Sequence, residues 1–213
     1  MPPRILALLL VLLLAACGVT EESPPAGEVR GDTFDEDVQL AQTHTEDYWR
    51  RQFAGLDREY RPVTRFVPYS GADGPACGGQ PAVPDNAFYC PAGHFIAYDR
   101  GWMEALWNEM GDGSVYVIIP HEIGHAVQAQ LGTVFELNVQ QELQADCYAG
   151  AALGAMVKAG ELQAEADDDT ELLLNLAAAG DPSDDWFNPQ AHGTAGQRQQ
   201  SFAAGYTNGA GSC

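Results

Sequence analysis

The chain has 213 residues, which is enough for one domain with a hydrophobic core and too few for two full domains. Hydrophobic residues make up 46% of the chain, which excludes a wholly disordered protein. Its 10 basic residues face 30 acidic ones, and the formal net charge is −20. Because phosphate backbones would repel such a chain, the charge argues against nucleic-acid partners.

The first sixteen residues have the pattern of a secretion signal. One basic residue, Arg4, precedes an apolar run from Ile5 to Leu14 that is too short to cross a membrane comfortably. The run ends in Leu14-Ala15-Ala16-Cys17, which resembles the lipobox of bacterial lipoproteins, whose cysteine carries diacylglycerol. We therefore expect a lipoprotein signal peptide over 1–16 and an extracytoplasmic protein held at the membrane by a lipid on Cys17. The alternative is an ordinary signal peptide with an incidental cysteine.

The next part of the chain predicts a tether, a helix and a short strand. Residues 17–35 are acidic and rich in Pro, Gly and Ser, which predicts a flexible tether before a domain that spans 36–213. Apolar residues near helical spacing predict a helix over 36–53. Residues 60–93 are rich in proline and glycine and predict a loop region with short extended pieces, which a strand over 94–99 follows.

The second half of the chain has the pattern of helices that end at glycines. The spacing predicts helices over 115–131 and 138–159, ended by Gly132 and Gly160. An acidic N-cap cluster at 167–169 predicts a third helical stretch up to Gly180, and a final helix is expected from 194 or 195 to 206. Together these elements predict an α+β fold that is mostly helical, with a small sheet from the central part of the chain.

Four cysteines remain once Cys17 is assigned to lipid, and an even number suits disulfides in an oxidising compartment. Three pairings are possible among Cys77, Cys90, Cys147 and Cys213. A Cys77–Cys90 bond would staple a Gly/Pro-rich loop, and Cys147–Cys213 would then pin the last residues onto a central helix. A zinc site made of cysteines is the competing idea, but the chain has no CxxC spacing.

The segment His121-Glu122-Ile123-Gly124-His125 carries the strongest chemical signal. Histidines at i and i+4 lie on one face of a helix and can direct one imidazole each at the same Zn²⁺. Glu122 is angled toward the open coordination position, where it can act as general base on zinc-bound water. The alternative is a helix with two incidental histidines.

We expect the third ligand to come from the next predicted helix. Glu142 and Asp146 are also four residues apart, so they share a helical face. Glu142 can reach the ion, and Asp146 can accept the outer N–H of a ligating imidazole and so fix its tautomer. This HExxH and ExxxD arrangement is that of the gluzincins. A solvated acidic helix face is the alternative, which the apolar neighbours Leu143 and Ala145 disfavour.

Over roughly residues 45–213 the chain resembles the bacterial neutral zinc metallopeptidases. Besides the HExxH, the resemblance rests on Cys77-Gly78, Tyr89-Cys90-Pro91, Glu142-Leu143-Gln144-Ala145-Asp146-Cys147, His192-Gly193-Thr194 and Gln197-Arg198. It implies a zincin-like fold, one catalytic zinc and hydrolysis of a peptide or protein substrate. It also implies a side chain that stabilises the oxyanion, for which His192 is the candidate. The alternative for His192 is a loop histidine that caps the last helix.

Pro120 departs from the pattern of this family, which has a small helix former before the first histidine. Proline has no backbone N–H to donate and crowds residue 116. We therefore expect the helix either to begin late, near 117–119, or to kink at Pro120, with a tilt of His121 as the consequence.

The sequence as a whole predicts a zinc metallopeptidase in which His121, His125 and Glu142 hold Zn²⁺. Glu122 and His192 are the expected catalytic residues. The alternatives are a zinc-containing envelope lipoprotein that binds a partner without hydrolysis, a disulfide-stapled adhesion domain with an empty metal site, and an enzyme that hydrolyses a non-peptide amide.

Overall fold

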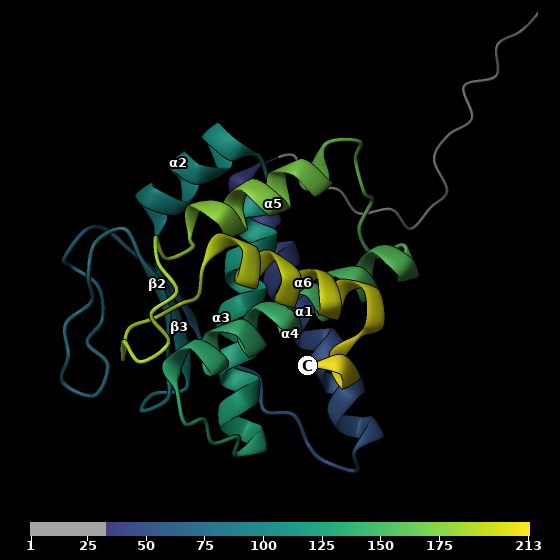
Figure 1. The fold of residues 1–213 in the computed structure, drawn as a ribbon, viewed down its shortest axis with the longest axis horizontal. Coiled ribbons are helices and arrows are strands. Elements are labelled where there is room, and N and C mark those ends of the chain that lie inside the picture. Colours follow the sequence, from purple (N-terminus) through teal and green to yellow (C-terminus); the bar gives the residue numbers. More distant parts are fainter. Residues whose placement is uncertain (1–32) are drawn as a thin grey trace, which may run out of the picture.

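The computed structural model describes residues 33–213, so the predicted signal peptide, Cys17 and most of the predicted tether lie outside the described residues. The helices are α1 (Phe34–Gly55), α2 (Arg100–Met110), α3 (Gly113–Leu131), α4 (Asn138–Ala159), α5 (Asp168–Ala178), α6 (Ala195–Asn208) and the short 3₁₀ helix η1 (Ala210–Ser212) (Figure 1). The strands are β1 (Phe66–Tyr69), β2 (Ala87–Cys90) and β3 (Phe95–Asp99). The prediction of a mostly helical α+β fold with a small sheet is therefore confirmed.

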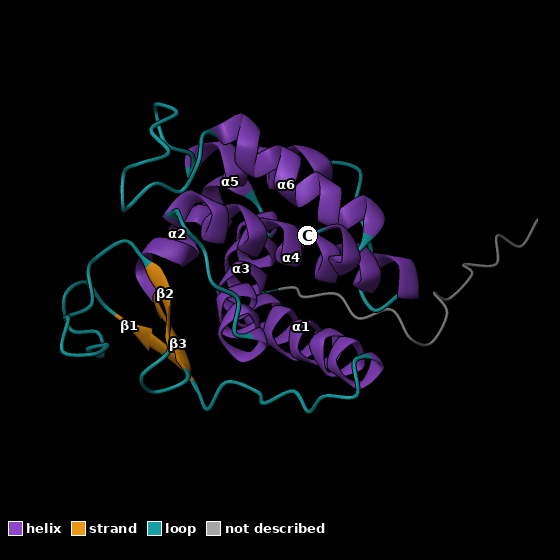
Figure 2. Ribbon diagram, turned by 60° about the horizontal axis from the view of Figure 1, so that its bottom comes forward, coloured by secondary structure: helices purple, strands orange, loops and turns teal. Residues whose placement is uncertain are grey.

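The three strands form one mixed sheet at the side of the helices (Figure 2). β3 is central: it pairs in parallel with β1 and antiparallel with β2, and all of its residues are buried. β2 is consequently an edge strand, which leaves the backbone groups along its outer side without a strand partner in the sheet. A Cys77–Cys90 disulfide ties the preceding loop to the end of β2. Within residues 33–213, no helix is both long and apolar enough to cross a membrane.

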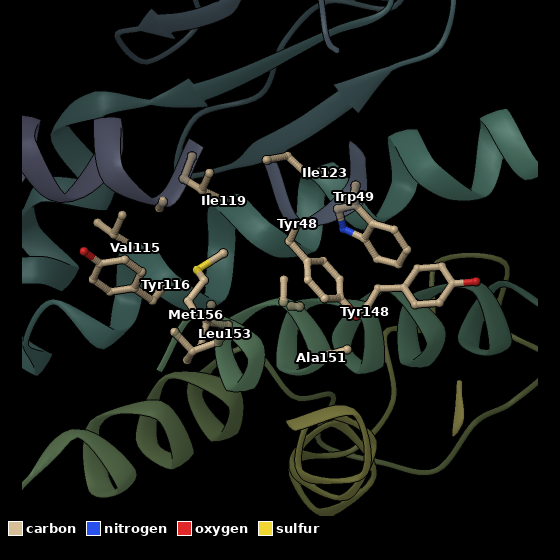
Figure 3. Packing of buried hydrophobic residues seen from close by; sticks show 14 of the residues in the cluster. Tyr48, Trp49, Val115, Tyr116, Ile119, Ile123, Tyr148, Ala151, Leu153 and Met156 are labelled. Atoms are coloured by element: carbon tan, nitrogen blue, oxygen red, sulfur yellow. The ribbon is translucent and has the colours of Figure 1, made fainter. Parts of the chain in front are cut away.

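The core lies where α3 packs against α1 and α4. Val115, Ile119 and Ile123 of α3 are fully buried and belong to the cluster of buried residues drawn in Figure 3. On α1, the ring of Trp49 meets Tyr148 of α4 edge to face at 4.8 Å between centroids. Because α3 is enclosed by its neighbours, the positions of its side chains are fixed by packing from both sides.

Two expectations about helix limits are wrong. α1 begins at Phe34 rather than at 36, because the side chain of Thr33 caps it by accepting a hydrogen bond from the backbone N–H of Glu36. α3 begins at Gly113 and continues through Pro120, so it does not start late. The loss of one backbone hydrogen bond at Pro120 is outweighed by the burial of the turns before it, in which Val115 and Val117 are almost fully enclosed.

Sequence patterning does not predict α2. The helix is short, and Asp99 at its N-cap makes no side-chain capping hydrogen bond.

Glycines bring α4 and α6 into backbone contact. A Cβ atom on Gly205 would lie 1.9 Å from the carbonyl oxygen of Cys147, and one on Gly150 would lie 2.0 Å from that of Phe202. Only hydrogen atoms fit in this space, so the two helices approach more closely than any larger residue allows. The Cys147–Cys213 disulfide fastens the end of the chain to the same part of α4.

The substitution Gly205→Ala should therefore destabilise the fold by about 1–3 kcal/mol or more, because α6 has to move away from α4. Gly196→Ala is the matched control, since this residue lies on the same helix with open space around its Cα, and we expect it to be neutral or slightly stabilising. Urea unfolding followed by circular dichroism measures both. Equal midpoints for the two variants would show that the close approach is not required.

Candidate metal centre

Three side chains on two helices converge on one point. α3 carries His121 and His125 one turn apart, and α4 brings Glu142 to them. The two imidazole Nε2 atoms are 3.1 Å apart, and Glu142 Oε2 lies 3.2 Å from Nε2 of His121 and 3.5 Å from Nε2 of His125. The structure thus brings together all three residues that the sequence predicts as ligands.

The spacing of these atoms fits zinc. Nitrogen and oxygen ligands bind Zn²⁺ at about 2.1 Å, so two ligand atoms of a tetrahedral site lie about 3.4 Å apart. The three distances between the ligand atoms, 3.1 to 3.5 Å, agree with this value. Two imidazoles and a carboxylate that leave one position open are also a ligand set of catalytic zinc sites.

Hydrogen bonds on the far side of each imidazole fix its tautomer. Nδ1 of His121 lies 2.8 Å from the Asp146 carboxylate, and Nδ1 of His125 lies 2.9 Å from Oε1 of Gln128. Both partners are acceptors, so each Nδ1 carries the proton and each Nε2 of a neutral ring keeps its lone pair. Two lone pairs that face each other at 3.1 Å repel unless a cation lies between them. This arrangement is the chemical evidence that the residues suit a metal.

Gln128 is a functional residue that sequence reasoning missed. Its amide nitrogen donates to the backbone carbonyl of Gln141 at 2.8 Å and to Oε1 of Gln144 at 3.2 Å. These bonds orient the amide so that its oxygen faces His125. The signal available in the sequence is the i, i+3 spacing from His125 to Gln128, which places both on one face of α3.

Asp146 is held by a buried arginine. Arg198 of α6 donates from Nε to one carboxylate oxygen at 2.8 Å and from Nη2 to the other at 2.7 Å. Burial raises the pKa of Asp146, but the charge and hydrogen bonds of Arg198 and of His121 outweigh it, and the pKa lies below its usual range. Asp146 therefore stays ionised and keeps its acceptor for His121.

The charges of Asp146 and Glu142 also determine how strongly the ligand atoms attract a cation. Burial lowers the pKa of His121, but hydrogen bonds to Asp146 and Glu142 together with their charges raise it to about 10. Burial raises the pKa of Glu142, yet the two histidines hold it well below its usual range. The centre therefore favours a positive charge between the ligands, which either a proton or Zn²⁺ can supply.

Gly124 sets the separation of the two helices at the metal centre. A Cβ atom on Gly124 would lie 3.1 Å from the carbonyl oxygen of Ala145 and 3.2 Å from its Cα, tighter than ordinary contact. A larger residue would push α4 away from α3 by a few tenths of an ångström and would displace Glu142 from the histidines. Packing against α4 thus constrains the size of the residue at position 124.

A cavity of roughly 660 Å³ surrounds the centre. The three ligands and Glu122 line it, and one side is formed by Asn86 and by the β2 residues Ala87, Phe88 and Tyr89. Glu122, 7% exposed, is the residue that the sequence predicts as general base, and the structure places it in the same cavity as the ligands.

His192 lies at the rim of this cavity, with half of its side chain exposed. Its backbone N–H and that of Gly193 donate to Oδ2 of Asp181 at 2.6 and 2.9 Å, and its Nδ1 lies 3.8 Å from Oδ1 of the same residue. Thr194, not His192, caps α6, so the capping alternative for this histidine is wrong. Asp181 gives no sequence signal, because nothing in its spacing connects it to His192.

The family model described as "Putative neutral zinc metallopeptidase" matches residues 16–213. The chain belongs to this zinc metallopeptidase family. Among the relatives of this metallopeptidase, "Uncharacterized protein YpfJ" of Escherichia coli (strain K12) is 31% identical over 193 residues, which cover 78% of this chain and 65% of the relative. "Uncharacterized protein Rv2575" of Mycobacterium tuberculosis (strain ATCC 25618 / H37Rv) is 34% identical over 179 residues, 70% of this chain and 60% of the relative. The chain thus spans less than two thirds of the length of these relatives. No solved structure matches it significantly.

The substitution Gln128→Ala should weaken zinc binding about 10- to 100-fold, because His125 loses the acceptor that fixes its tautomer. Competition with a chromophoric chelator measures the affinity. Gln200→Ala, at an exposed position of α6, is the control and should bind zinc as the wild type does. An unchanged affinity in Gln128→Ala would contradict the role assigned to this amide.

Proposed function

We propose that this metallopeptidase is a zinc-dependent endopeptidase that acts outside the cytoplasmic membrane, with Glu122 as its general base. One observation carries the proposal: two imidazole lone pairs and a carboxylate converge within 3.5 Å of one another in a cavity that also contains Glu122. A protein that only binds a partner has no use for a buried carboxylate beside such a centre.

The chemistry divides between the ion and the chain. Zn²⁺ held by His121, His125 and Glu142 would polarise the substrate carbonyl and lower the pKa of a bound water to about 7. Glu122 takes a proton from the attacking water and delivers it to the amide nitrogen as the C–N bond breaks. His192, at the rim of the cavity, donates a hydrogen bond to the carbonyl oxygen as negative charge develops on it.

The edge strand supports a peptide as substrate. β2 has no strand partner on its outer side, and four consecutive residues from Asn86 to Tyr89 line the cavity. An extended peptide can pair with such an edge through backbone hydrogen bonds, whatever its side chains. A small non-peptide amide would leave this edge unused.

The decisive variant is Glu122→Gln, which keeps the shape of the side chain and removes its basicity. We expect peptide cleavage to fall by a factor on the order of 10² to 10⁴ while zinc content stays at one per chain. The readouts are cleavage of a peptide library analysed by mass spectrometry and metal analysis of the same samples.

Glu109→Gln is the control, since Glu109 is exposed on α2 and does not line the cavity. Full activity in Glu122→Gln would overturn the general-base role. A zinc-loaded wild-type protein that cleaves no peptide would favour the partner-binding alternative.

We also propose that a lipid on Cys17 anchors the enzyme. The Leu14-Ala15-Ala16-Cys17 sequence supports this, and the two disulfides suit an oxidising compartment. Cells fed a clickable palmitate should label the wild-type protein, and the label should be lost in Cys17→Ser, which should also leave the membrane fraction. Equal labelling of both proteins would refute the anchor.

A further inference from the structure

α2 has one apolar stripe whose two edges have different surroundings. Met103 and Trp107 pack into the core, where Met103 is fully buried. Trp102, Leu106 and Met110 follow one another at four-residue steps and form the other edge of the stripe, and all three line the cavity of the metal centre.

Of this second edge, only Trp102 packs against the core. Leu106 and Met110 are half-buried, and neither belongs to, or packs against, a hydrophobic cluster within residues 33–213. A surface helix ordinarily turns polar residues away from the core. Apolar side chains that face a water-filled cavity forgo stabilisation by burial, so their presence points to an apolar ligand group that covers them.

This edge adjoins the reacting groups. Ile118 of α3 lines the same cavity and lies one helical turn before Glu122, so it continues the apolar surface up to the general base. α2 and β2 lie on the same side of α3 in both views (Figures 1 and 2). A peptide paired with β2 would therefore run beside α2 as it reaches the metal ligands.

The charged side chains of the cavity do not come from α2. The carboxyl and guanidinium groups of the cavity are those of Glu122, Glu142 and Arg198, and its imidazoles are those of His121, His125 and His192, none of which lies on α2. α2 contributes none to the cavity. A lysine or aspartate side chain held against α2 would lose its hydration without gaining a partner.

We propose that Trp102, Leu106 and Met110 form the wall of a side-chain subsite, and that the enzyme selects a bulky apolar residue, such as Leu, Phe or Met, next to the scissile bond. This specificity rests on the proposed peptidase function. It assigns α2 the task of choosing the substrate, while α3 and α4 carry the metal centre.

Binding without turnover tests the subsite. Three peptide hydroxamates, identical except for a Leu, Lys or Asp side chain beside the hydroxamate, are titrated into the zinc-loaded full chain by calorimetry. We expect the Leu compound to have a dissociation constant at least about tenfold lower than the other two. Equal constants, or no binding of any of the three, would overturn the subsite.

A charge placed on the wall gives the matched test. Met110→Arg should weaken the Leu hydroxamate about tenfold and strengthen the Asp hydroxamate, because the new guanidinium pairs with the carboxylate. Asn108→Arg introduces the same charge on the same helix, at an exposed residue outside the cavity, and should leave the order of affinities unchanged. Identical effects of the two variants would show that the introduced arginine acts through its charge at a distance, and they would contradict the role of Met110 in the wall.

Cleavage of a peptide library, with and without a chelator, separates this inference from the proposed function. Chelator-sensitive cleavage with no bias toward apolar residues would refute the subsite and leave the peptidase proposal standing. A clear Leu preference in binding without cleavage of any peptide would refute the peptidase activity and keep the apolar wall as a binding site.

Discussion

The carboxylate of Asp146 is the group on which the metal centre depends. It is fully buried, and it accepts hydrogen bonds from the imidazole of His121 and from the guanidinium of Arg198. A buried carboxylate without partners is several kcal/mol less stable than one in water, so Asp146 is tolerable only while α6 holds Arg198 in place. The metal ligands on α3 and α4 thus rely on a helix that contributes no ligand itself.

Other features of the fold hold α6 close enough to α4 for Arg198 to reach Asp146. Gly150 and Gly205 let its backbone touch that of α4, and the Cys147–Cys213 disulfide begins one residue after Asp146. Nη1 of Arg198 also donates to the backbone carbonyl of Ala179, just beyond α5, at 2.8 Å. Three helices therefore meet at the ion pair of Asp146 and Arg198. The close backbone contacts between α4 and α6 serve to hold this ion pair together.

The metal ligands could be predicted from sequence because their geometry is local. His121 and His125, like Glu142 and Asp146, are pairs at i and i+4, and helical periodicity alone puts each pair on one face. Gln128 escaped prediction because a glutamine on a buried helix face carries no chemical signal until its partner is known. At Pro120 the late helix start, one of the two expected outcomes, does not occur, because tertiary packing outweighs the local penalty of the proline. α2 was missed because it is short and its N-cap residue, Asp99, makes no side-chain capping hydrogen bond.

The position of Arg198 in the chain also sets an order of maturation. All three metal ligands are synthesised before Arg198, and Cys213 follows it. Until α6 has folded onto α4, Asp146 lacks its counter-charge, so the imidazole of His121 has no firmly ionised acceptor to hold it. A nascent chain in which α6 has not yet formed therefore contains the HExxH helix without a finished metal centre.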